Sequence, residues 1–67
     1  MTKSEEKIFE TITKYINENG FSPSNRDIAE EVELSVSTTH AHLLKLREKG
    51  YINFVEGMAR SITIRGE

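Results

Sequence analysis

Apolar residues in the first fifty positions recur every three or four residues, the spacing of helices that bury one face. The first stretch opens near Thr2 and Ser4, which precede acidic residues as an N-cap does, and carries Ile8 and Ile12 on one side. It stops at Asn19-Gly20, where glycine accepts a left-handed backbone. These signals predict an amphipathic first helix.

A second, shorter helix is predicted directly after this stop. Ser24 and Asp27 have the spacing of a capping box, with Ser24 as the N-cap. Ile28 and Val32 lie on its apolar side, and with Leu34 they are expected to anchor the crossing of the next helix.

A third helix follows after very few residues. Ser35 is its natural N-cap, and Thr39, Leu43 and Leu46 follow at the spacing of one buried face. The pair Lys49-Gly50 ends it, because a basic residue and then glycine suit a helix C-terminus; the helix dipole is sufficient to explain Lys49.

The period of the pattern then changes from 3.6 to 2. Ile52 and Phe54 alternate with Asn53 and Val55, and Ile62 and Ile64 alternate with Ser61 and Thr63; residues 56–59 between them suit a turn. Two antiparallel strands joined as a β-hairpin are expected.

The order of these elements indicates a single domain over residues 1–67, mainly α with a small β-hairpin. A short helix, a tight turn and a longer helix form a helix-turn-helix, and the hairpin behind it makes this a three-helix winged helix-turn-helix. Such a fold binds double-stranded DNA with its third helix, here from about Ser35, in the major groove and the β-wing on the DNA backbone or minor groove.

The first turns of the third helix are unusually polar. Ser37, Thr38 and His40 are poor helix formers, and a surface helix selected for stability would carry Glu, Lys or Ala there. Small hydroxyls allow close approach to base edges, and His40 offers both a donor and an acceptor, so we expect DNA contacts. His42 is expected at the edge of the core. It lies about 200° around the helix from His40, so no metal site is expected.

Size and charge refine this interpretation. The 67 residues carry nine Lys and Arg against eleven Asp and Glu, a net charge of −2 that is unfavourable for DNA binding. Residues 1–34 hold four basic and eight acidic residues, whereas residues 35–67 hold five and three, so the basic half is expected to face DNA. Arg26, Lys45 and Arg60 are the candidates for neutralising phosphates.

The same composition excludes several other classes. There is no cysteine for disulfides or thiolate zinc sites, and so short a chain holds only a modest core. We expect a soluble cytoplasmic protein without membrane span, cofactor or enzymatic activity.

Several short stretches together resemble one known family: Ile8-Phe9, residues 20–24, Asp27-Ile28-Ala29, residues 40–43, Leu46, residues 49–52 and the wing from Gly57 to Ile62. Over nearly all its length the chain resembles the N-terminal DNA-binding domain of the LexA repressor family. It is most similar to members from Gram-positive bacteria, which carry a His-small-His-Leu run like residues 40–43.

The resemblance implies a three-helix bundle with a two-stranded wing, operator binding and transcriptional repression, usually of DNA-damage (SOS) genes. By position, it assigns base reading to Ser35, Ser37, Thr38, His40 and Ala41. It assigns contacts with the DNA backbone to Ser24, Asn25, Arg26 and the wing around Arg60.

The chain departs from the family pattern in three respects. Glu33 stands where members usually have glycine, and the turn before the third helix is one residue shorter. The family's C-terminal self-cleaving protease domain, which also dimerises it, has no counterpart in these residues. The chain is therefore expected to be either an excised domain or a naturally short phage or plasmid regulator.

A second class of function is compatible with the sequence. The acidic first half, with Glu30, Glu31 and Glu33 clustered, could serve a protein-interaction module that meets a basic partner or mimics DNA. The two hypotheses differ in which half of the molecule matters for function.

A single recognition helix reads only a few base pairs, so useful specificity requires a second copy about ten base pairs along a palindromic operator. The chain has no spare apolar helix for a dimer seam. We therefore expect a monomer, or at most a weak dimer, away from DNA.

Overall fold

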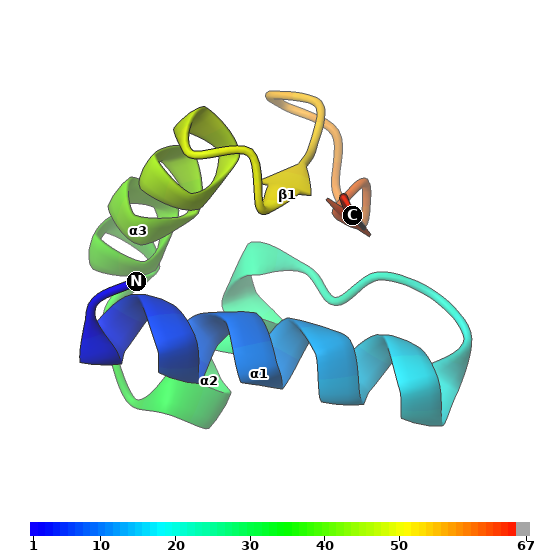
Figure 1. Cartoon of the computed structure of the whole chain (residues 1–67). Helices are drawn as coiled ribbons and strands as arrows, with labels where there is room; N and C mark the ends of the chain where they lie inside the picture. Colours follow the sequence, from blue (N-terminus) through cyan, green and yellow to red (C-terminus); the bar gives the residue numbers. More distant parts are fainter. Residues whose placement is uncertain (66–67) are drawn as a thin grey trace.

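Three helices and a short antiparallel hairpin make up the computed structural model, which describes residues 1–65 (Figure 1). The elements, in chain order, are α1 (Lys3–Asn19), α2 (Asn25–Val32), α3 (Val36–Glu48), β1 (Ile52–Asn53) and β2 (Thr63–Ile64). In Figure 1, α1 runs across the lower half of the molecule, and α3 and the hairpin lie above it. The predicted winged helix-turn-helix is confirmed.

Ser24 and Ser35 cap α2 and α3 as predicted, and of the two candidates before α1, Thr2 and Ser4, the cap is Thr2. The hydroxyls of Thr2 and Ser24 accept the backbone N–H three residues on, and the acidic side chains there return the bond, which completes two capping boxes. Ser35 accepts the N–H of Thr38 at 3.1 Å. At the end of α1, Gly20 has φ 80°, the left-handed conformation that glycine adopts without strain.

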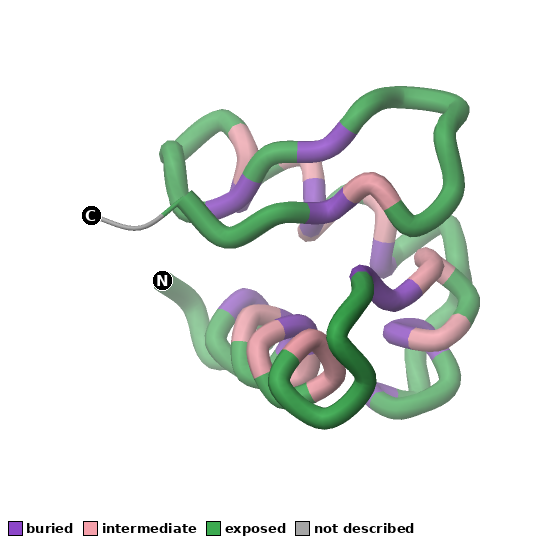
Figure 2. The backbone as a smooth tube through the Cα atoms, turned by 90° about the vertical axis from the view of Figure 1, so that its right-hand side faces the viewer, coloured by how far each residue is buried: buried purple, intermediate pink, exposed green. Residues whose placement is uncertain are grey.

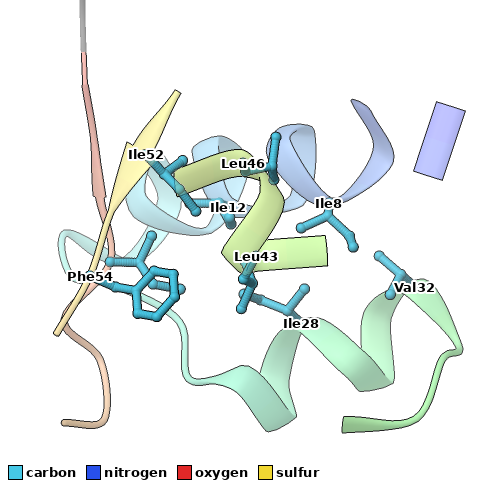
Figure 3. Close-up of a cluster of buried hydrophobic side chains, with 9 residues drawn as sticks. Ile8, Ile12, Ile28, Val32, Leu43, Leu46, Ile52 and Phe54 are labelled. Carbon is cyan, nitrogen blue, oxygen red and sulfur yellow. The ribbon is translucent and has the colours of Figure 1, made fainter. Parts of the chain in front are cut away.

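One apolar core joins the three helices and β1, and Phe54 and Ile62 of the hairpin complete it (Figure 3). Figure 2 shows buried and exposed stretches alternating along the helices and along the hairpin, as expected when each element contributes one face. Among residues 1–65, the apolar residues with no exposed surface are Ile8, Ile12, Ile28, Leu43, Leu46 and Ile52. Burial of each contributes about 1.5–3 kcal/mol, so this small cluster is the main source of stability.

The turn between α2 and α3 corrects one prediction. Leu34 was expected to anchor the helix crossing, yet it is 38% exposed. The reason is Glu33, whose backbone is left-handed (φ 61°, ψ 41°) and reverses the chain at the end of α2. Ile28 and Val32 are buried as predicted.

The hairpin has the predicted antiparallel pairing, with Ile52 opposite Ile64, but only two residues of each strand join the ladder. Side chains replace ladder bonds further along: the N–H of Phe54 donates to the side chain of Asn53, and that of Val55 donates to Ser61. The strands are shorter than predicted because these local bonds compete with strand pairing.

Two polar contacts that the pattern did not predict tie distant segments together. The Ile62 N–H donates to the hydroxyl of buried Ser22 at 3.1 Å, which fastens the hairpin to the loop before α2. Lys49 Nζ lies 3.0 Å from the carboxylate of Glu5, which is only 1% exposed. Lys49 therefore does more than complement the dipole of α3, because it also pairs with a buried acid.

Candidate DNA interface

The face of α3 that points away from the core carries small side chains in its first turns, and Lys45 and the acidic Glu48 toward its end. Ser37, Thr38, Ala41 and Lys45 are all exposed. At 3.6 residues per turn they lie within an arc of about 100°, opposite the buried Leu43 and Leu46. The small side chains of Ser37, Thr38 and Ala41 leave room for the first turns of α3 to lie against a flat or grooved partner.

Ser35 lies at the start of the same helix, but its hydroxyl already serves the fold. It accepts the Thr38 N–H and donates to Thr38 Oγ1 at 3.0 Å. Ser35 therefore caps α3 as predicted and also orients the side chain of Thr38. The contact with a base that was predicted for Ser35 would lie at this same first turn of α3.

His40 lies on the flank of α3 that faces the hairpin. Its Nδ1 is 3.3 Å from the side-chain amide nitrogen (Nδ2) of Asn25, at the start of α2. Its Nε2 is 3.5 Å from Glu56 Oε1, in the turn of the hairpin, and its ring meets Phe54 edge-on. His40 thus connects three elements and is half-buried instead of projecting freely.

The start of α2 approaches this flank and, with the hairpin, encloses a groove of about 330 Å³ lined by Ser24, Asn25, Arg26, His40, Val36 and residues 54–62. The hydroxyl of Ser24 is used in the capping box, whereas Arg26 is exposed. The structure thus brings the predicted contacts at residues 24–26 next to α3 and the wing.

Arg60 is placed differently from a free wing-tip arginine. Its guanidinium pairs with Asp27 at 3.0 Å and donates to the Tyr15 hydroxyl and the Ser22 carbonyl, both at 3.1 Å. The bond with Tyr15 and the nearby carboxylate raise the pKa of Arg60. The backbone bond from Ser24, with a smaller effect of the Arg60 charge, lowers the pKa of Asp27. Arg60 therefore joins the wing to α1 and α2.

These features agree with the comparison to known families. Residues 1–61 match the family model of the LexA DNA binding domain. The chain belongs to the LexA DNA-binding domain family.

Curated relatives from several bacteria match the chain, and all of those named below are LexA repressors. The chain is 39% identical over 64 residues to the LexA repressor of Thermosipho melanesiensis. This match covers 96% of the chain and 32% of the relative. It is 45% identical to the LexA repressor of Caldicellulosiruptor saccharolyticus, with the same coverage. The match to the LexA repressor of Staphylococcus epidermidis, at 43% identity, covers all of this chain and 33% of the relative. The chain thus spans about a third of the length of these relatives.

Within this LexA-family domain, sequence reasoning did not single out Glu56 and Arg47, which meet on the wing side of α3 at 3.6 Å. Glu56 lies in the turn of the hairpin, beyond the two residues of β1, so strand alternation does not predict the direction of its side chain.

The acidic half of this LexA-family domain forms a separate surface. A groove between α1 and α2 is lined by Lys7, Glu10, Thr11, Lys14, Tyr15, Glu18, Asp27, Glu30 and Glu31. It shares no residue with the groove beside the wing. Among residues 1–65, no helix has the length and apolar character needed to cross a bilayer.

Proposed function

We propose that this chain is a sequence-specific binder of double-stranded DNA that acts in transcriptional repression. Repression is drawn from the relatives, which are named as LexA repressors. The observation that carries the proposal is the outward face of α3, where Ser37, Thr38 and Ala41 are exposed. None of these three side chains is part of the apolar core. An α-helix fits the major groove, and short side chains let it approach the base edges.

Base reading is proposed for all five positions that the family resemblance indicates, in two groups. Ser37, Thr38 and Ala41 face outward and make direct contacts. Ser35 acts partly by holding Thr38, and His40 reaches DNA from the side of α3 that carries the wing.

Contacts with the DNA backbone are proposed at both ends of the interface. Arg26 and Lys45 are exposed and neutralise phosphates, and Ser24 and Asn25, which adjoin Arg26 at the start of α2, add contacts there. Arg60 would reach phosphate or the minor groove only by exchanging part of its pairing with Asp27, so its main contribution is to hold the wing in place.

The domain is further proposed to act in the cytoplasm as a pair on a palindromic operator, each copy reading one half-site. Away from DNA it is expected to be a monomer, or at most a weak dimer, because the apolar faces of α1, α2 and α3 are used in the core. Sedimentation at micromolar concentration without DNA tests this. A tight dimer in that experiment would contradict it.

The experiment that tests the function is a binding selection from a library of random duplex DNA, followed by a salt titration on the best sequence. An enriched, two-fold symmetric motif is expected. If about four to six phosphates are contacted, log K falls against log salt with a slope of roughly −4 to −5. Failure to enrich any sequence, or binding that is insensitive to salt, would overturn the proposal.

A second candidate function rests on the groove between α1 and α2, where five acidic side chains outnumber two lysines. A basic protein partner could bind there. Glu30→Gln with Glu31→Gln separates the candidates, because these exposed positions line only this groove. Loss of biological repression with DNA affinity retained would favour the protein partner.

A further inference from the structure

Glu56 places a carboxylate on the side of the molecule that is proposed to meet DNA, where a negative charge is unfavourable. Its two oxygens lie against two residues of α3: Oε1 is 3.5 Å from His40 Nε2, and Oε2 is 3.6 Å from Arg47. His40 and Arg47 are seven positions apart, two helical turns, and therefore share one side of α3. The single carboxylate of Glu56 is thus paired with both His40 and Arg47.

The geometry around Arg47 holds it toward the wing. One guanidinium nitrogen donates to the Phe54 carbonyl at 3.2 Å, and the guanidinium lies over the Phe54 ring, 4.3 Å from its centroid. The side chains of His40, Arg47 and Glu56 nevertheless remain 34%, 33% and 55% exposed. The group is ordered by the fold and still accessible to a large ligand.

We propose that Glu56 determines DNA affinity by standing in for a phosphate. Its carboxylate occupies the guanidinium of Arg47 and the imidazole of His40 in the free protein, and it repels phosphates that approach the wing. On binding, Arg47 exchanges this carboxylate for a phosphate oxygen, which is the same kind of partner for a guanidinium. This inference rests on the proposed DNA-binding function.

The inference predicts a gain of binding when the charge is removed. Glu56→Gln keeps the size of the side chain, frees Arg47 for a phosphate and removes one repulsive charge. We expect binding to a mixed-sequence duplex of about two helical turns to tighten by about 3- to 10-fold. The slope of log K against log salt should steepen by about one, because the Glu56 carboxylate that Arg47 releases on binding retains one cation beside the DNA, and Glu56→Gln does not.

The matched control is Glu30→Gln, which changes the net charge equally on the groove between α1 and α2. It should change affinity by less than about two-fold and leave the slope unchanged, because at ordinary salt distant charges are screened. In the double variant Glu56→Gln with Arg47→Gln, the steeper slope should disappear. Fluorescence anisotropy between about 50 and 200 mM salt measures all of these variants.

The outcomes separate this inference from the proposed function. If the unaltered protein binds no duplex, the proposed function fails. If it binds and Glu56→Gln is not tighter, or has an unchanged slope, Glu56 does not compete with phosphate and the inference is overturned. Weaker binding by Glu56→Gln would also overturn it and assign Glu56 to holding the wing. Glu56→Ser, which also removes the carboxylate, gives the same test if the glutamine variant does not fold by circular dichroism.

Discussion

Replacing Glu33 with glycine should stabilise the protein, although it removes a side chain from the centre of the helix-turn-helix. Glu33 is the C-cap of α2, and its backbone is left-handed, with φ 61° and ψ 41°. Its own N–H and that of Leu34 both donate to the Ala29 carbonyl, so the turn geometry is fixed by the helix end. The side chain is exposed, so no packing is lost on substitution.

The magnitude follows from two opposing effects on the backbone. A left-handed conformation costs a residue with a Cβ about 1–2 kcal/mol, and glycine is free of this cost. Glycine loses about 0.4–1 kcal/mol through the greater freedom of the unfolded chain. Removing a negative charge from a helix C-terminus adds a few tenths of a kcal/mol. We therefore expect Glu33→Gly to raise the free energy of unfolding by about 1 kcal/mol, or Tm by about 4–8 °C.

Thermal and urea melts followed by circular dichroism measure this change, with two controls. Glu33→Ala removes the charge but keeps the left-handed strain, so it should gain only a few tenths of a kcal/mol. Glu31→Gly, inside α2, should lose about 1 kcal/mol because its backbone is helical. If Glu33→Gly is neutral or destabilising, or if alanine matches it, the conformational explanation is wrong.

Three further predictions concern stability. Leu43→Ala, at a fully buried position of α3, should cost about 2–5 kcal/mol in a urea melt, and a cost below 1 kcal/mol would contradict the single core. Thr39→Val should stabilise by about 1 kcal/mol, because the buried Thr39 hydroxyl has no hydrogen-bond partner among residues 1–65; a loss would reveal a partner. The bond from Lys49 lowers the pKa of Glu5, so this pair stabilises the fold above the ordinary glutamate pKa, and its contribution is lost as the pH falls through the lower, folded value. Melts between about pH 6 and 3 should therefore lose less Tm in Glu5→Gln than in the unaltered protein, and equal losses would contradict the assignment.

Local chemistry made most of the fold predictable from the sequence. Ser24 and Ser35 cap their helices through bonds that reach only three residues along the chain, so their sequence spacing is sufficient to identify them. The buried face of α3 follows from helical periodicity for the same reason. Leu34 was mispredicted because an apolar residue next to a helix resembles a core residue until the chain reversal at Glu33 is known.

Long-range pairing was not predictable in the same way. Arg60 meets Tyr15 across 45 positions, and Lys49 meets Glu5 across 44, so no local spacing links the partners. An exposed arginine in a turn and a lysine at a helix end have ordinary local explanations. Only the packing of the wing and of α3 against α1 brings these side chains to their partners.

The central claim is that α3 reads the DNA sequence, and the ratio of specific to non-specific affinity tests it most directly. The variant Ser37→Ala with Thr38→Val removes two exposed hydroxyls and leaves the Ser35 cap on the backbone in place. Its affinity is measured by anisotropy on the selected duplex and on a scrambled duplex of the same composition. We predict a loss of at least about ten-fold on the selected duplex, at about 1–3 kcal/mol per lost contact, and less than about two-fold on the scrambled one. Equal losses on both duplexes, or none on the selected one, would contradict the account.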